Sequence, residues 1–211
     1  MREVAIGIAP GNRTPRGLAV VAAILSYAGK PMPRWADKRW TQTHGWQDLQ
    51  RRSIQGPKIG ALGRRWFAAC DVPDLALFPD RYPEVERVTF HAGLELPLLH
   101  FGLWVFTWPV RLGLVRNLAA AAPLFKKNAD TFERFGTDRG GMFLEITGDD
   151  TEGNPMKRSW HLIAGAGHGP WIPCMPAVIL ARKLAHGEIK ARGAMPCFNM
   201  ITLEEFAEAV A

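Results

Sequence analysis

MFLEITGDDTEGNPMKRSWHLIA, residues 142–164, carries the clearest signal of the fold in this chain. Residues 142–147 and 157–164 are two predicted strands, and the polar segment 148–155 between them consists of turn-forming residues. Strands joined by such a loop pair side by side in opposite directions. We therefore expect an antiparallel hairpin here and a sheet around it.

Further elements are expected on both sides of the hairpin. They are strands at 4–8, 64–69 and 87–91, and helices at 18–27, within 98–135, over 177–187 and from 202 onward. Residues 31–63 show no sustained period, so we expect loops, turns and short helical pieces there. Because strands and helices are segregated, we predict an α+β fold. It would have a mixed, largely antiparallel sheet with helices packed on one face.

Local signals set the helix ends. Thr14 is the predicted N-cap of the first helix, with Pro15 at its first helical position, and Gly29 ends it. Pro123 either kinks the stretch 98–135 or starts a new helix there. Thr202 opens the last helix with a capping box. No linker composition divides the chain, so residues 1–211 are expected to form a single domain.

Composition narrows the classes of function. The chain has 211 residues, 47% hydrophobic and 22% charged, which is enough for a sizeable core. Its formal net charge of +6 favours acidic partners, but the basic residues are scattered in pairs, so we expect no nucleic-acid binding. The three cysteines show no C-x-x-C spacing, and a reducing cytoplasm fits them best. The histidines show no metal-ligand spacing, so no metal is expected.

The most apolar stretch is Leu96–Val110, which carries no formal charge. A membrane span needs about 20 such residues, so this one is too short. A buried helix or a surface for homodimerisation is therefore favoured over contact with a membrane surface.

Glycines 165, 167 and 169 lie between a predicted strand and a predicted helix, where a dinucleotide-binding turn would be placed. Pro170 stands where G-x-G-x-x-G requires its third glycine, and prolines lack the amide donors that bind a pyrophosphate. We therefore interpret the loop as a substrate wall or a domain seam. His168 within it is a candidate general acid or base, and the alternative is a loop histidine bonded to backbone or water.

A better anion site is predicted near the start of the chain. The turn Gly11–Gly17 joins a strand to a helix N-terminus and carries Arg13 and Arg16, whose guanidinium groups can bind a carboxylate or phosphate bidentately. The alternative is a structural turn whose arginines are solvated or paired with acidic residues. Both interpretations stay open.

Three more residues are candidates for ligand binding. Asp71 and Asp74 flank Val72-Pro73 at the end of a predicted strand and would supply a carboxylate to a substrate ammonium, although this is also ordinary turn chemistry. Arg139 is presented by a turn with Gly140 and Gly141, where a solvated arginine is the alternative.

Several stretches taken in order resemble bacterial saccharopine dehydrogenase-like proteins. They are Pro10–Gly17, Cys70–Leu75 with Leu77-Phe78-Pro79, Arg139–Met142, Trp160 with Gly169-Pro170 and Ile172-Pro173, and Gly193–Cys197 before Leu203–Phe206. The resemblance runs from near the first residue to near the last, and it corresponds to the part of that family which follows the nicotinamide-binding Rossmann domain.

The resemblance implies a parent enzyme in which an N-terminal Rossmann domain holds NAD(P). The present domain would close over the cofactor, supply the substrate pocket and form much of a homodimer contact. No cofactor is expected on this chain itself, so we expect the isolated chain to be unable to transfer hydride.

These expectations combine into one hypothesis. The chain would be the substrate-binding and dimerisation domain of an NAD(P)-linked oxidoreductase acting on an amino acid or imino dicarboxylic compound. Arg13, Arg16 and Arg139 would bind carboxylates, Asp71 or Asp74 would meet an ammonium, and His168 would move a proton. The alternative is a non-catalytic interaction module whose apolar segment forms a homodimer or associates with a membrane surface.

Overall fold

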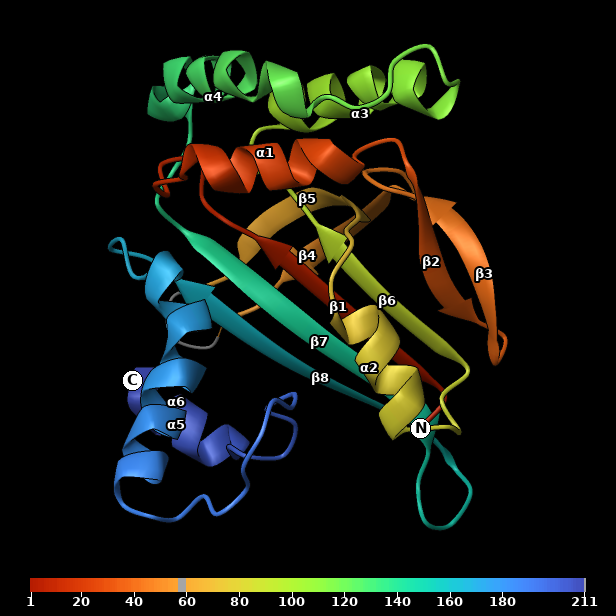
Figure 1. Ribbon diagram of the computed structural model, residues 1–211, viewed down its shortest axis with the longest axis vertical. Helices are drawn as coiled ribbons and strands as arrows, with labels where there is room; N and C mark the ends of the chain where they lie inside the picture. Colours follow the sequence, from red (N-terminus) through yellow and green to blue (C-terminus); the bar gives the residue numbers. More distant parts are fainter. Residues whose placement is uncertain (57–59, 211) are drawn as a thin grey trace. The chain divides into compact units, whose positions relative to one another are not determined.

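The computed structural model describes residues 1–56 and 60–210. Contacts within the chain divide it into two compact units, residues 1–167 and 168–211. The first unit holds a mixed sheet and four α-helices (Figure 1). In chain order its strands and helices are β1 (Glu3–Ala9), α1 (Leu18–Tyr27), β2 (Pro31–Ala36), β3 (Arg39–His44), β4 (Gln50–Ile54), β5 (Leu62–Ala69), α2 (Asp74–Arg81), β6 (Arg87–Ala92), α3 (Pro97–Arg111), α4 (Ala122–Thr131), β7 (Gly140–Asp149) and β8 (Pro155–Ala164).

The sheet has eight strands in the order β3-β2-β6-β1-β7-β8, and β5 also pairs with β6 and with β4. Only the β1–β6 pair is parallel among the described strands. The predicted hairpin is confirmed as β7 and β8, which pair from Gly140 opposite Ala164 to Asp149 opposite Pro155. The predicted α+β class with a largely antiparallel sheet is therefore confirmed.

Both faces of the sheet are covered by apolar side chains. On one face Val4 and Ile6 of β1 pack with Leu75 of α2, because alternate residues of a strand point the same way. Phe67 and Phe143 meet edge to face in another cluster, at a centroid distance of 5.5 Å. A third cluster buries the inner sides of α1 and α3.

Residues 31–63 differ most from expectation, and residues 57–59 of that stretch lie outside the described residues. Instead of loops and short helical pieces the chain forms β2, β3 and β4. The hairpin of β2 and β3 turns at Asp37 and Lys38, both with positive φ of 55° and 56°. Two-residue hairpin turns of this kind favour Asn-Gly or Asp-Gly. A sequence without that glycine gives no turn signal, and the prediction was wrong for this reason.

The predicted helix over residues 18–27 is confirmed as α1, but its predicted cap was wrong. The helix begins at Leu18 with Gly17 as its N-cap, three residues after Pro15, and no side chain caps it. Thr14 instead lies in a tight turn, where its N–H donates to the carbonyl of Gly11 at 3.0 Å. Gly29 ends the helix as expected, with a φ of 80°.

The predicted helical stretch 98–135 is interrupted. α3 ends at Arg111, and Gly113 follows with a φ of 74°. The chain then passes through the short 3-10 helix η1 (Ala119–Ala121) into α4, which has Pro123 in its first turn. Pro123 therefore starts a new helix, one of the two alternatives. A second 3-10 helix, η2 (Glu133–Phe135), follows α4.

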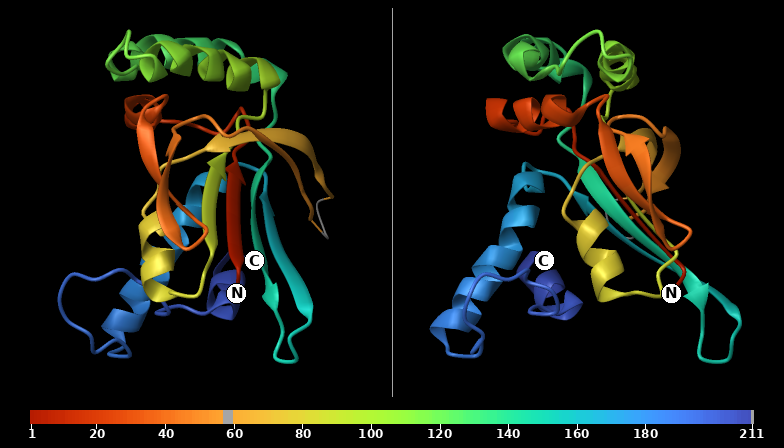
Figure 2. Two further views of the ribbon diagram at one scale, coloured as in Figure 1. Left: turned by 90° about the vertical axis from the view of Figure 1, so that its right-hand side faces the viewer. Right: turned by 45° about the vertical axis from the view of Figure 1, so that its right-hand side comes forward.

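α3 and α4 lie side by side beyond α1, near the carboxyl ends of β1 and β6 (Figures 1 and 2). Phe106 of α3 meets Phe125 of α4 edge to face at a centroid distance of 5.3 Å. The helices of the described residues are all too short or too polar to cross a membrane.

The second unit contains the 3-10 helix η3 (Gly169–Cys174), α5 (Met175–Ala185) and α6 (Leu203–Val210). Lys183 of α5 and Glu205 of α6 form an ion pair at 2.6 Å. Glu205 also accepts a hydrogen bond from the backbone N–H of Thr202 and donates its own N–H to the Thr202 hydroxyl, so the predicted capping box is confirmed.

Candidate functional site

A cluster of buried polar contacts lies where β1 runs into the turn Gly11–Gly17, and we call this turn the arginine turn. Its centre is Arg65 of β5, whose side chain is only 8% exposed. The Arg65 guanidinium donates to the carbonyls of Ala9 at 2.9 Å and Arg139 at 3.0 Å, and to Glu95 Oε1 at 3.1 Å. The buried side chain of Arg65 thus joins β5 to three other segments of the chain.

Glu95 is the acceptor on which these segments converge. It follows β6, and its carboxylate accepts from the N–H of Asn12 at 2.6 Å, the N–H of Thr137 at 2.8 Å and the Thr137 hydroxyl at 2.6 Å. Burial by itself raises the pKa of this carboxyl. The hydrogen bonds from Thr137 and Asn12 and the charge of Arg65 outweigh burial and hold the pKa of Glu95 below its usual value. Glu95 is therefore ionised at neutral pH.

The arginine turn is held from inside as well. Arg16 donates to the backbone carbonyl of Asn12, and to its side-chain oxygen at 3.1 Å. Asn12 in turn donates its side-chain N–H to the carbonyl of Phe132 at 2.8 Å. Burial lowers the pKa of Arg16, and nearby acidic residues, led by Asp130, act against that shift. The contacts of Arg16 therefore fit the interpretation of Gly11–Gly17 as a structural turn.

Arg13 is different because its side chain is exposed. Its backbone N–H donates to the carbonyl of Thr137 at 2.9 Å, which fixes the backbone, while its guanidinium makes a long contact of 3.4 Å to the carbonyl of Arg134. Residues 17–20 are also exposed and form the uncapped start of α1, with no acidic residue in its first turn. An anion could be bound here by Arg13 together with helix amides.

Arg139 belongs to the same neighbourhood. Its carbonyl accepts from Arg65, and its backbone N–H donates to the Thr137 hydroxyl at 3.1 Å. A Cβ placed on Gly165 would lie 3.6 Å from Cγ of Arg139, so the glycine backbone passes close to this side chain. The structure thus brings Arg13, Arg16 and Arg139, the three residues predicted to bind carboxylates, to one end of the sheet.

The two predicted carboxylates lie elsewhere, in the connection from β5 to α2. Asp71 is exposed, and Asp74 is the first residue of α2, where a negative charge favours the helix N-terminus. Next to Asp71, the Tyr27 hydroxyl lies 3.1 Å from the Cys70 sulfur. Burial, followed by the charge of Cys70, raises the pKa of Tyr27, and burial raises the pKa of Cys70. Cys70 is therefore a protonated core thiol rather than a nucleophile.

His168 opens the second unit and is exposed. Its carbonyl accepts from the N–H of Trp171 at 3.0 Å, at the start of η3. Pro170 and Pro173 lie inside η3, and Pro176 lies in the first turn of α5. Because none of these prolines has an N–H, this segment does not fit a dinucleotide phosphate.

A pair of side chains that the sequence did not indicate lies on another part of the sheet. His91 of β6 is 3% exposed, and its Nε2 is 3.4 Å from Oδ2 of Asp48. Arg34 approaches the same carboxylate at 3.7 Å, and the contact with His91 contributes most to lowering the pKa of Asp48. The crevice beside them has a volume of about 10 Å³, the lower limit for one water molecule, so it offers no room for a metabolite.

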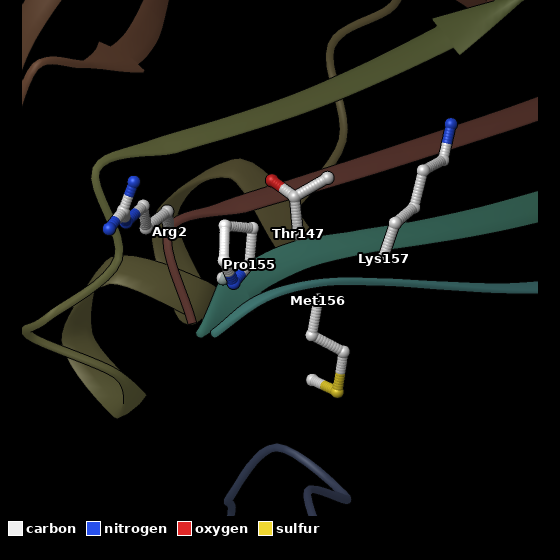
Figure 3. Close-up of a pocket in the computed structure, with 6 residues that line it drawn as sticks. Arg2, Thr147, Pro155, Met156 and Lys157 are labelled. Atoms are coloured by element: carbon white, nitrogen blue, oxygen red, sulfur yellow. The ribbon is translucent and has the colours of Figure 1, made fainter. Parts of the chain in front are cut away.

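A larger hollow of about 290 Å³ lies at the far end of the β7–β8 hairpin (Figure 3). Its two cations are paired with acidic residues: Arg2 with Asp149 at 2.7 Å and Lys157 with Glu145 at 3.1 Å. Figure 3 shows Met156 pointing to the side opposite Lys157. Because both cations are paired and the hollow is open, the arginine turn is the better candidate for binding a charged metabolite.

Arg65 and Glu95 were missed by the sequence analysis, although each carried a signal. Arg65 lies on the same strand face as the buried Phe67. The alternation of side chains along a strand therefore predicts by itself that Arg65 is buried. Glu95 immediately precedes the uncharged stretch 96–110. Among the described residues no group of three or more His, Cys, Asp and Glu side chains could hold a metal ion.

The fold is similar to that of a solved protein structure. Comparison with protein-family models and with curated protein sequences gave no match. Comparison with solved structures shows a saccharopine dehydrogenase-like fold.

One neighbour with this fold is apo histidine-tagged saccharopine dehydrogenase (L-Glu forming) from Saccharomyces cerevisiae. The two structures superpose with a TM-score of 0.57 at 11% sequence identity. The match covers 100% of the present chain and 63% of the yeast chain, so the present chain spans less than two thirds of that enzyme's length.

Proposed function

We propose that this chain is the C-terminal, substrate-binding and dimerisation domain of an NAD(P)-linked oxidoreductase related to saccharopine dehydrogenase. The main observation behind this proposal is that the fold of the whole chain matches part of a saccharopine dehydrogenase. The resemblance of sequence motifs to bacterial members of the same group agrees with it. A Rossmann domain on another part of the parent protein would bind the nicotinamide cofactor, and the parent would work in the cytoplasm.

The arginine turn supports binding of a dicarboxylic substrate. Arg13, Arg16 and Arg139 bring positive charge to one end of the sheet, where the carboxylate of Glu95 is already bound by Arg65, Asn12 and Thr137. Arg13 is the exposed side chain that can turn toward a ligand, while Arg16 binds the backbone of the turn that presents it. An amino acid or imino dicarboxylate is the substrate class that matches such a site.

Asp71 or Asp74 would meet a substrate ammonium, and His168 would move a proton between substrate and solvent. These roles belong to the complete enzyme, because the cofactor supplies the hydride chemistry and this chain supplies binding and orientation.

Titration of the isolated chain with glutamate and with saccharopine, followed by NMR chemical-shift changes, tests the proposal. We expect both compounds to shift amide signals of residues 11–18 and Arg13→Gln to remove these shifts, while NADH and NADPH leave the spectrum unchanged. Tight binding of either nucleotide, or dicarboxylate shifts confined to other parts of the chain, would contradict the assignment. Light scattering of the same sample tests the homodimer.

A further inference from the structure

The outward side of α3 is apolar, unlike that of an ordinary surface helix. His100, Leu103, Thr107 and Val110 form its buried side. On the opposite side Leu98, Val105 and Leu112, seven residues apart, are 65%, 56% and 67% exposed. A helix that is apolar all round is normally covered on every side. The outer side of α3 therefore indicates a binding partner beyond the first unit.

The exposed apolar surface continues past the end of α3. Leu114 is 76% exposed and Val115 is 41% exposed in the segment that leads to η1, and Leu124 of α4 is 60% exposed. We name this surface the apolar cap; it comprises Leu98, Val105, Phe106, Trp108, Leu112, Leu114, Val115 and Leu124. It lies on α3, on α4 and on the segment that joins them, beyond α1 (Figures 1 and 2).

Within residues 96–129, which carry the apolar cap, the formal charges are all positive. From Leu96 to Ala129 the sequence contains no Asp or Glu, but it contains Arg111, Arg116, Lys126 and Lys127. Arg111 lies over the ring of Trp108, 5.0 Å from its centroid, and Lys126 pairs with Asp130 at 2.6 Å. Arg116 and Lys127 are exposed.

The positive charge is also specific to the first unit. Residues 168–211 contain four basic and four acidic side chains, so the formal net charge of the chain resides in residues 1–167. A surface of exposed leucines, valines and aromatic rings within a ring of cations is complementary to a layer that is apolar inside and negative at its surface.

We propose that the apolar cap binds the surface of an anionic phospholipid bilayer, with Leu112, Leu114 and Val115 entering the headgroup region and Arg116 and Lys127 contacting lipid phosphates. A second copy of the chain is the weaker alternative. It would bring the same cations against one another, and residues 96–129 supply no acidic side chain to pair with them. The proposal concerns where the protein works and does not depend on its enzymatic role.

Sedimentation of the full chain with liposomes tests this proposal. One set of vesicles contains phosphatidylcholine alone and the other contains phosphatidylcholine with 30% phosphatidylglycerol, a composition chosen for the assay. We expect at least tenfold stronger binding to the anionic vesicles, weakened by 0.5 M salt. Because each cation near such a surface strengthens binding about fivefold, Arg116→Gln with Lys127→Gln should weaken it about 25-fold.

The apolar contribution is tested with Leu112→Glu combined with Leu114→Glu, which should reduce binding at least tenfold. Both side chains are exposed, so circular dichroism should be unchanged. Leu184→Glu, at a leucine of α5 that is 55% exposed, is the matched control and should bind like the parent chain.

Light scattering without lipid distinguishes binding to a bilayer from binding to a second copy of the chain. A dimer that the double Glu variant converts to monomer, with no binding to vesicles, would overturn the proposal in favour of a second copy. Equal binding to neutral and anionic vesicles, or binding to neither, would also overturn it.

Discussion

Glu95 and Arg65 form a buried ion pair at the end of the sheet, with 3.1 Å between Oε1 and the guanidinium and side-chain exposures of 13% and 8%. The pair connects β5 and the end of β6 to the arginine turn and to residues 137–139, since both partners also bind the backbone of those segments. The position of Arg13 therefore depends on Glu95 and Arg65, although neither of these residues needs to contact a ligand.

Removing either partner alone should be strongly destabilising. Glu95→Gln leaves Arg65 buried without its counter-charge, and Arg65→Met leaves the carboxylate unpaired, so each should lower the free energy of unfolding by about 3–5 kcal/mol. The double variant should cost less than the sum of the single changes. Urea unfolding of all four proteins measures the coupling, and additive effects would show that the pair does not act as a unit.

Stability should also fall at acid pH because of Glu95. The pKa of this carboxyl is lower in the folded chain than its usual value of 4.5, so its contribution is fully present above 4.5 and is lost as the pH falls through the folded value. Urea unfolding between pH 5 and 3 should show a smaller loss of stability in Glu95→Gln than in the parent chain.

Arg13 and Arg16 should separate ligand binding from stability. Arg16 is half-buried and bound to Asn12, so Arg16→Gln should lower the free energy of unfolding by about 1–3 kcal/mol. Arg13 is exposed, so Arg13→Gln should change it by less than about 0.5 kcal/mol while removing dicarboxylate binding. Thermal unfolding and NMR titration of the two variants would give the reverse pattern if Arg16 were the ligand-binding residue.

His100 should make the chain less stable below neutral pH. It is fully buried, and burial lowers its pKa from 6.5 to about 4. The unfolded chain therefore binds a proton at a higher pH than the folded chain does, and stability is lost as the pH falls from 6.5 toward 4. We expect a loss of about 2 kcal/mol between pH 7 and pH 5.

His100→Asn is the control for this effect. Nδ1 of His100 accepts from the N–H of Leu94 at 3.4 Å, and Nε2 has no hydrogen-bond partner among the described residues. An asparagine oxygen can replace Nδ1 as acceptor but does not titrate. Urea unfolding at pH 7 and pH 5 should therefore show a flatter dependence in the variant, and an unchanged slope would exclude His100 as the cause.

The sequence predicted those parts of the fold whose signals are local. The hairpin of β7 and β8 has a polar turn between two strands, and α6 begins with a capping box, so both were found. The hairpin of β2 and β3 was missed because Asp37-Lys38 does not resemble a usual turn of positive φ. α2 was not predicted, and it contains Pro79, a residue that usually interrupts a helix.

The candidate site was found only in part, for a physical reason. Arg13, Arg16 and Arg139 were indicated by glycine-containing turns, which are visible in a short window. The pairing of Glu95 with Arg65, Asn12 and Thr137 joins residues 30 to 83 positions apart. No local pattern marks such a network, because it exists only once the sheet has assembled.

The close approach of α1 to α3 gives a test that needs no ligand. A Cβ on Gly29 would overlap the carbonyl oxygen of Thr107 and lie 2.8 Å from Cβ of Val110, and its φ of 80° disfavours any other residue. Gly29→Ala should therefore cost about 2–4 kcal/mol. Gly113 has a similar φ of 74° with no atom within 4 Å of an added Cβ, so Gly113→Ala should cost only about 1 kcal/mol. Chemical denaturation of both variants isolates the packing contribution, and equal losses would mean that α1 and α3 do not pack as described.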